Sequence, residues 1–140
     1  MPCLEISIPK LNDDVKINLA KQLTETFGKI SGFPSEIFGI RFYEYNLSDA
    51  FSGGEMTDKG QQRPYLHFLL YIPRISRDVK KGLVKEFTRV FTEVTGYPEW
   101  KPVIHIAEHP YDNVGVEGQL LSDAYPDLAG RKFYYDLPKK

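Results

Sequence analysis

The sequence predicts an α+β fold in which a β-α-β unit occurs twice and forms a four-stranded sheet with both helices on one face. An internal repeat carries this prediction, supported by alternating apolar residues in the strand segments and by matched apolar stripes in two helical segments. Shifting the sequence by 64 aligns residues 6–58 with 70–122 without a gap, and 14 of these 53 positions are identical. Average residue usage gives roughly three identities by chance. The chain is therefore a tandem duplication.

The pattern of each repeat predicts a strand, a helix and a second strand. The first strands alternate apolar and other residues, and the second strands are expected at about 39–45 and 103–108. Two strands joined by a helix in one sheet should be parallel, with a right-handed crossover. The apolar residues of the first strands are Leu4, Ile6 and Ile8 in one repeat and Leu66, Phe68, Leu70 and Ile72 in the other.

Both helices have clear predicted ends. Asn12 and Ser76 are suitable N-caps, and Gly32 and Gly96 are natural residues for a left-handed C-terminal cap. The apolar stripes between them are spaced four, four, four and three residues apart, as on one face of a helix. They are Val15, Leu19, Leu23, Phe27 and Ile30 in the first repeat and Val79, Leu83, Phe87, Phe91 and Val94 in the second.

The chain is expected to be one domain, with repeats at about 2–60 and 65–124 and a tail at 125–140. The polar, glycine-bearing stretch 46–64 is interpreted as the linker between the repeats. One face of the sheet would remain without cover, so we expect oligomerisation through that face. Aromatic residues suited to such an interface are Tyr43, Tyr45, Tyr71 and the tail residues Phe133, Tyr134 and Tyr135.

Composition excludes several classes of function. Apolar content of 41% with 26% charged residues is ordinary for a globular protein, and a net charge of −1 indicates neither nucleic-acid nor membrane binding. Cys3 is the only cysteine, so no intrachain disulfide or thiolate metal cluster is expected. The histidines are not at metal-ligand spacings and no phosphate-binding or dinucleotide-binding loop is present, so no metal or cofactor is expected. Without an apolar run of roughly 18 residues or a signal-like start, a cytoplasmic location is expected.

Pro2 is the most informative residue. It follows Met1 directly and opens the first strand, so removal of the methionine would leave a prolyl secondary amine at the end of a structured element. An α-amino group has an unperturbed pKa of about 7.7–8.0, and burial would lower it further. Such an amine can act as a general base near neutral pH. The alternative is that Met-Pro is a common start and that the terminus merely frays.

Pro2 together with the duplication resembles the tautomerase superfamily, whose members use an amino-terminal proline on a β-α-β unit. Residues 112–123, in sequence DNVGVEGQLLSD, are similar to the end of a 4-oxalocrotonate tautomerase unit. Residues 20–24 and 49–54 of the first repeat resemble the fused, two-unit branch that contains cis-3-chloroacrylic acid dehalogenase. The resemblance implies the tautomerase (MIF-like) fold and a homotrimer whose open sheet faces turn inward as a barrel. It also implies one site per chain, because Leu66 takes the place of Pro2 in the second repeat.

The resemblance implies a small carboxylate as substrate and leaves three functions open. A neutral Pro2 amine would catalyse keto–enol tautomerisation of a 2-oxo or enol carboxylic acid. A cationic Pro2 amine would instead protonate a carbon during hydration or dehalogenation of a 3-substituted acrylic acid. The third hypothesis is that the protein is not an enzyme but a ligand-binding or structural trimer that retains the fold without the chemistry.

Three arginines are candidates for binding the substrate carboxylate, which a guanidinium matches with two hydrogen bonds. Arg41 lies in Gly39-Ile40-Arg41, which resembles the segment carrying a substrate-binding arginine in 5-carboxymethyl-2-hydroxymuconate isomerase, and its strand parity places it away from the helices. Arg74 and Arg77 have the spacing of an arginine pair in the dehalogenases, in a shifted register. For all three, a solvated surface arginine is the alternative.

Two further candidates come from the second repeat. His105 is one repeat after Arg41 and coincides with a catalytic tyrosine position in the dehalogenases, although a lone strand histidine also suits an interface. If one residue is inserted in the alignment, Glu117 matches the water-activating glutamate of the dehalogenases. Without an insertion, Glu117 takes the place of a glycine in the hairpin of 4-oxalocrotonate tautomerase. Phe27 stands where those dehalogenases have a catalytic histidine, and this favours tautomerase chemistry over hydration.

Overall fold

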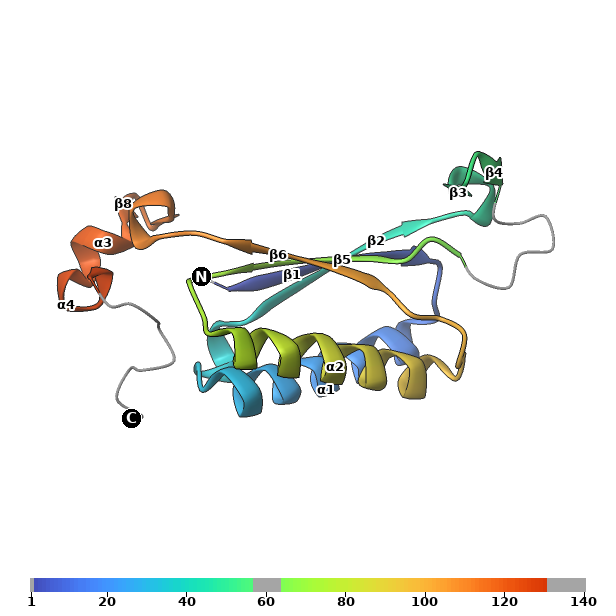
Figure 1. Ribbon diagram of the computed structural model, residues 1–140, viewed down its shortest axis with the longest axis horizontal. Coiled ribbons are helices and arrows are strands. Elements are labelled where there is room, and N and C mark those ends of the chain that lie inside the picture. Colours follow the sequence, from blue (N-terminus) through green and yellow to red (C-terminus); the bar gives the residue numbers. More distant parts are fainter. Residues whose placement is uncertain (1, 57–63, 131–140) are drawn as a thin grey trace.

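The computed structural model describes residues 2–56 and 64–130, and it confirms the predicted α+β architecture. A four-stranded sheet lies on a layer of two long helices, so one face of the sheet is covered and the other is open (Figure 1). The strand order is β2-β1-β5-β6. β1 is parallel to β2 and β5 is parallel to β6, while β1 and β5 run antiparallel at the centre. The main elements are β1 (Cys3–Pro9), α1 (Asp13–Ser31), β2 (Gly39–Tyr45), β5 (His67–Ile72), α2 (Arg77–Thr95) and β6 (Val103–Glu108).

The duplication extends beyond the main strands and helices. A short 3-10 turn and a two-stranded hairpin follow β2, and the same pair of elements follows β6 exactly one repeat later in the chain. We expected 46–64 to be a linker, and this was wrong for 46–56, which form the turn and hairpin of the first repeat. Residues 57–63, and the tail residues 133–135 proposed for an interface, lie outside the described residues. The small elements are η2 (Leu47–Asp49), β3 (Phe51–Ser52) and β4 (Glu55–Met56), then η3 (Tyr111–Asn113), β7 (Gly115–Val116) and β8 (Gln119–Leu120).

Three further short helices complete the described chain: η1 (Ser35–Ile37), α3 (Leu121–Ala124) and α4 (Pro126–Ala129). Among the described residues, none of the helices combines the length and apolar character that a membrane crossing requires.

The core lies between the sheet and the helix layer. Even-numbered residues of β1 and β5 point into it, and the helix stripes meet them from the other side. Phe27 is fully buried and stacks on Phe38 with ring centroids 4.0 Å apart. Burying a side chain of this size contributes about 1.5–3 kcal/mol relative to leaving it exposed. The fully buried core residues include Leu4, Ile6, Ile8, Leu19, Leu23, Phe68, Leu70, Ile72, Leu83, Phe87 and Phe91.

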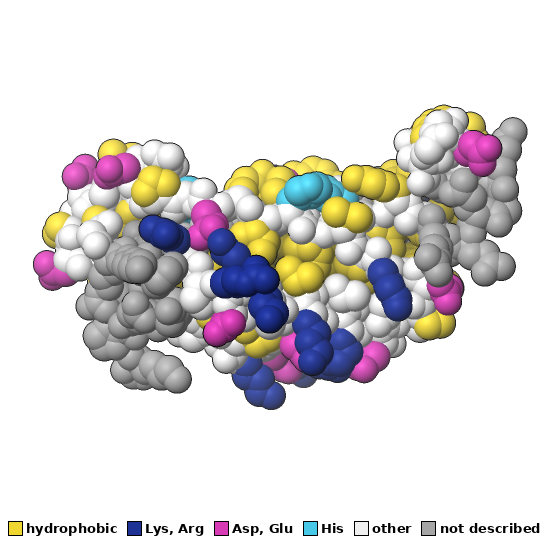
Figure 2. Space-filling model, in the orientation of Figure 1, with side chains coloured by type: hydrophobic (Ala, Val, Ile, Leu, Met, Phe, Trp, Pro, Cys, Tyr) yellow, Lys and Arg dark blue, Asp and Glu magenta, His cyan; other side chains and the backbone are white. Residues whose placement is uncertain are grey.

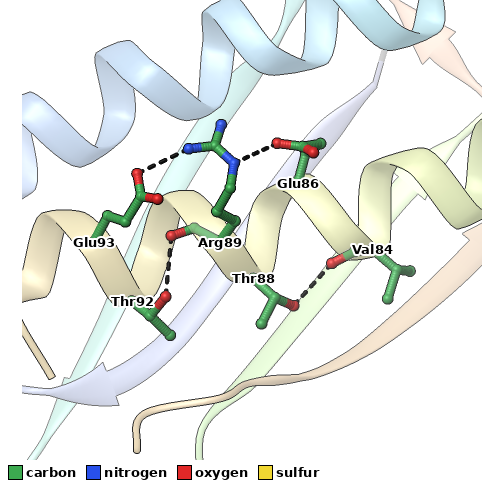
Figure 3. Close-up of polar contacts among 6 residues, drawn as sticks. All are labelled: Val84, Glu86, Thr88, Arg89, Thr92 and Glu93. Carbon is green, nitrogen blue, oxygen red and sulfur yellow. Dashed lines mark hydrogen bonds and ion pairs between the residues drawn. The ribbon is translucent and has the colours of Figure 1, made fainter. Parts of the chain in front are cut away.

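The helix ends largely follow the sequence signals. The Ser76 hydroxyl accepts a hydrogen bond from Val79 N at 3.2 Å, whereas the Asn12 side chain makes no capping bond although it occupies the matching position. Gly32 and Gly96 adopt the left-handed conformation with φ of 77° and 74°, as the C-terminal caps require. On the exposed face of α2, Arg89 pairs with Glu86 at 2.6 Å and with Glu93 at 2.8 Å (Figure 3). These are local i, i+3 and i, i+4 pairs.

One contact explains two of the identities between the repeats. The Glu44 carboxylate accepts a hydrogen bond from Leu11 N at 2.8 Å and pairs with Lys16 at 2.8 Å, which ties the end of β2 to the start of α1. In the second repeat, Glu108 accepts from the backbone of Ile75 and pairs with Lys80 in the same way. Lys16 and the Leu11 amide hold the pKa of Glu44 below its usual value.

We predict that Glu44→Gln lowers the free energy of unfolding by about 1 kcal/mol, because it removes a charge-assisted hydrogen bond. The folded pKa of Glu44 is depressed, so its contribution is present above the pKa of a free glutamate, about 4.3, and is lost as the pH falls through the folded value. Urea unfolding at pH 7 and at pH 3 measures the difference, with Glu25→Gln on the exposed side of α1 as the control. A deficit that persists unchanged at pH 3 would contradict this account.

The β7–β8 turn places a glutamate where glycine is favoured. Glu117 has a φ of 54° and Gly118 one of 83°, and the matching residues of the first repeat are Gly53 and Gly54 with φ of 59° and 81°. A residue with a Cβ is strained in this conformation by about 1–2 kcal/mol.

We therefore predict that Glu117→Gly raises the free energy of unfolding by about 0.5 kcal/mol, because relief of strain exceeds the added chain entropy. Gly118→Ala is the matched opposite, and should lower stability by about 1 kcal/mol or more. Thermal unfolding of both variants tests the pair. Destabilisation by Glu117→Gly would show that the glutamate side chain makes a contact worth more than its strain.

Candidate functional site

The open face of the sheet carries the odd-numbered residues of the four strands, because side chains alternate across a strand. The strand registers place these residues in three rows that cross β2, β1, β5 and β6 in that order. The rows are Gly39–Cys3–Tyr71–Ala107, Arg41–Glu5–Leu69–His105 and Tyr43–Ser7–His67–Val103. In the middle row, Glu5 and Leu69 occupy equivalent positions of the two repeats and pair with each other across β1 and β5.

The two ends of this face are equivalent by the repeat but differ in chemistry. Pro2 is buried at one end, and its carbonyl accepts a hydrogen bond from Gly39 N at 3.3 Å. Leu66 takes the same place at the other end, and its carbonyl accepts from Val103 N at 2.9 Å. We call these the proline end and the leucine end. Burial of Pro2 agrees with the expectation that the first residue after the methionine is part of the fold.

A cavity of about 240 Å³ opens at the proline end. Among the described residues that line it, Arg41 is the only cationic side chain and Glu5 is the only anionic one, and they are partners across the β1–β2 pair. Pro2 and Glu5 are three residue steps apart along extended backbone, a distance of about 10 Å. The lining residues are Cys3, Leu4, Glu5, Gly39, Ile40 and Arg41.

A hydrogen-bonded network surrounds this charge pair. The Arg41 guanidinium donates from Nη1 to the Tyr43 hydroxyl at 3.1 Å. Tyr71 and Tyr43 both donate to the Glu5 carboxylate, and with Arg41 they hold the pKa of Glu5 below its usual value. The same interaction with Glu5 raises the pKa of Tyr71. Sequence reasoning placed Arg41 on this face correctly but missed Glu5, whose odd position on β1 was the available signal.

The leucine end carries a pair of histidines instead. His67 Nε2 and His105 Nδ1 lie 2.7 Å apart, and by the repeat these residues stand for Cys3 and Arg41. Burial and the neighbouring His105 lower the pKa of His67. Figure 2 shows histidine side chains among hydrophobic ones on the sheet side of the molecule, while most lysines and arginines in this view lie lower, over the helix layer.

Within one chain the structure does not bring all the predicted site residues together. His105 and Arg41 share a row but lie on the two edge strands, about 14 Å apart at the spacing of neighbouring strands. Arg77 is the exposed first residue of α2 and lines a groove of the helix layer with Lys80, Lys81 and Lys85. Arg74 is exposed in the connection from β5 to α2, at the end of β5 that lies beside the start of β1.

The remaining candidates fall in clearly different surroundings. Glu117 is exposed in the β7–β8 turn, at the position of Gly53 in the first repeat, as the gapless alignment predicts. Phe27 is in the core, so no polar group of α1 takes the place of the dehalogenase histidine there.

His109 is a titratable residue that sequence reasoning did not single out. Its backbone amide donates to Ile72 O at 3.1 Å, which places it at the proline end of the sheet. Its Nε2 atom is buried and has no hydrogen-bond partner in the described part of the chain, and burial lowers the pKa of the ring. The described ranges 2–56 and 64–130 contain no cluster of three or more histidine, cysteine or acidic side chains suited to a metal ion.

Comparisons with known proteins agree with this architecture. Residues 64–124 match the sequence family described as Tautomerase enzyme. No curated protein sequence matches the chain significantly. The fold matches native fused 4-OT with a TM-score of 0.79 at 20% identity, covering 86% of this chain and 97% of that one. It also matches the R7 fused 4-OT, an asymmetric trimer, with a TM-score of 0.73 at 21% identity over 87% and 98% of the two chains.

A third similar structure is that of a dehalogenase-family protein. N1, a member of the cis-3-chloroacrylic acid dehalogenase family, superposes with a TM-score of 0.69 at 17% identity, covering 84% of this chain and 82% of that one. The second repeat therefore has the sequence of a tautomerase unit, and nearly the whole chain has the architecture of the fused proteins. The sequence match to the Tautomerase enzyme family thus covers the second repeat, and the likeness of the chain to the fused proteins is a likeness of fold.

Proposed function

We propose that this chain is a cofactor-free tautomerase that interconverts the enol and keto forms of small 2-oxo carboxylic acids, with the amine of Pro2 moving the proton. The observation that carries the proposal is the position of Pro2, which is buried at the one end of the open face where a cavity contains an arginine. The leucine end has the same backbone arrangement but cannot offer a free amine, since Leu66 lies within the chain.

The proposed reaction needs two proton transfers. After Met1 is removed, the neutral amine of Pro2 takes the proton from the 2-hydroxyl group of the enol, and the C–O bond becomes a carbonyl. The cationic amine then gives a proton to C3, so the keto acid forms and the amine returns to its neutral state. This is general acid–base catalysis, which is most effective when the pKa lies near the working pH. Burial of the amine would disfavour the cation and so lower that pKa.

The proposed binding group for the substrate carboxylate is Arg41, whose guanidinium can form two parallel hydrogen bonds with it. The Tyr43 hydroxyl already fixes one side of this guanidinium, which reduces the entropy lost on binding. Arg74 and Arg77 remain further candidates, and Arg74 is the better placed because it follows the end of β5 beside β1.

We further propose that the working assembly is a homotrimer, formed through the open face. The R7 fused 4-OT with the same fold is an asymmetric trimer. The open face of this chain exposes Tyr43 and Val103, which favours a covered state. His105 lies about 14 Å from Arg41 on the opposite edge strand, so a role for His105 at the proline-end site would be across a subunit boundary.

Hydration or dehalogenation of a 3-substituted acrylic acid is the second candidate, and the likeness to N1 favours it. The core position of Phe27 argues against it, because the helix then supplies no histidine. The two functions require opposite charge states of Pro2. A tautomerase base should be neutral at pH 7, whereas the hydratase acid should be cationic.

We expect the Pro2 amine to titrate with a pKa below about 7, because its burial penalises the cation. Titration of ¹⁵N-proline-labelled protein by NMR measures this value directly. The rate kcat/KM should rise with pH through the same value, since only the neutral amine is the base. A pKa above about 8 would favour the hydratase.

The direct test of the proposed function is Pro2→Ala. We expect kcat for ketonisation of phenylenolpyruvate to fall by about 10²–10⁴, the usual contribution of a positioned general base. Pro9→Ala, at the other end of the same strand, is the matched control and should keep its activity.

Intact mass must first show that both proteins have lost Met1, and circular dichroism that both are folded. Equal activity in the wild type and in Pro2→Ala would end the assignment. Glu117→Gly, assayed in parallel, shows whether Glu117 takes part.

A further inference from the structure

The cavity at the proline end is electrically balanced. Among its lining residues, the single positive charge of Arg41 faces the single negative charge of Glu5. One substrate carboxylate can pair with Arg41. A second carboxylate in the same cavity would lie beside Glu5, and like charges at such short range repel.

Glu5 is held in its charged form. Tyr71 and Tyr43 donate hydrogen bonds to its carboxylate, and these bonds hold the pKa of Glu5 low. Glu5 therefore stays anionic throughout the neutral pH range. The two tyrosines come from the strands on either side of β1.

Among the described residues that line the cavity, none besides Arg41 supplies a positive charge. Burial lowers the pKa of both His67 and His109, so neither ring is charged at neutral pH. His105 is hydrogen-bonded to His67 on the far edge strand. Arg74 does not line the cavity.

The second repeat provides an internal comparison. The residues that match Glu5, Arg41 and Tyr43 are Leu69, His105 and Ala107. Glu5, Arg41 and Tyr43 thus all belong to the repeat that has the proline, while Tyr71 comes from the second repeat. Residues required by the fold, such as Glu44 and Glu108, are the same in both repeats.

We propose that Glu5 restricts the proline-end site to monocarboxylates, so that the substrate is a 2-oxo or enol acid with one carboxylate and an uncharged, apolar remainder. This inference rests on the proposed function, because it concerns the same site. Tyr43 and Tyr71 beside the cavity offer aromatic surface to such a remainder. Glu5 acts here as a specificity-determining residue and takes no part in the proton transfer.

The test compares a monocarboxylate with a dicarboxylate. Phenylenolpyruvate and 2-hydroxymuconate are assayed at pH 7.5 with the wild type, Glu5→Gln, Tyr71→Phe and Glu25→Gln. The wild type should favour phenylenolpyruvate in kcat/KM by at least tenfold. Glu5→Gln should raise the relative kcat/KM for 2-hydroxymuconate at least tenfold, chiefly through a lower KM.

The other two variants separate charge from structure. Tyr71→Phe removes a hydrogen bond to Glu5 but keeps its charge, so the preference for the monocarboxylate should remain. Glu25→Gln removes one charge from the exposed side of α1, and should change neither ratio. Thermal unfolding establishes that each variant is folded.

Binding measurements with unreactive acids test the role of Glu5 independently of the proposed function. Affinities for 3-phenylpropanoate and adipate, which do not react, are measured by NMR titration for the wild type and Glu5→Gln. Failure of the wild type to turn over either substrate would end the tautomerase proposal, while the binding ratio would still decide the role of Glu5. The inference is overturned if Glu5→Gln changes the ratios by less than twofold, or if the wild type favours the dicarboxylates.

Discussion

The alternation of side chains across β1 is the constraint on which the rest of the structure depends. Leu4, Ile6 and Ile8 are committed to the core between sheet and helices, so Cys3, Glu5 and Ser7 must lie on the open face. The same alternation in β2 places Arg41 and Tyr43 on that face beside them. A shift of either strand by one residue would bury the charges and break up the site. Fold stability and site assembly therefore depend on one register.

The duplication separates structural residues from candidate functional ones within a single chain. Lys16 and Glu44 recur as Lys80 and Glu108, and both pairs tie a strand end to a helix start. By contrast, Pro2, Glu5 and Arg41 are replaced by Leu66, Leu69 and His105. The first kind of position is constrained by packing and hydrogen bonding, which the two halves share. The second kind differs between the repeats, and in the first repeat these residues lie at or beside the proline end.

Much of the fold follows from the sequence, because periodicity and end signals act locally. The second strands, the helix stripes and the glycine caps at Gly32 and Gly96 all occur where the pattern predicts them. The hairpin at 51–56 was missed because two-residue strands carry no periodicity, although the identity of Gly54 with Gly118 was a usable signal. Pro2 and Arg41 could be placed by strand parity. The Glu5 network and the buried ring of His109 could not, since both depend on contacts across strands that one sequence does not specify.

The central claim is that a free amine of Pro2 is the reactive group of this protein. An acetylenic 2-oxo acid such as 2-oxo-3-pentynoate tests this claim. The lone pair of a neutral amine attacks the alkyne carbon β to the ketone and forms a covalent adduct. The measurement is tandem mass spectrometry of the N-terminal peptide after treatment near pH 7.5. We predict one adduct per chain, on the nitrogen of Pro2, in protein that has lost Met1. Retention of Met1, or labelling confined to the neighbouring thiol of Cys3, would contradict the account.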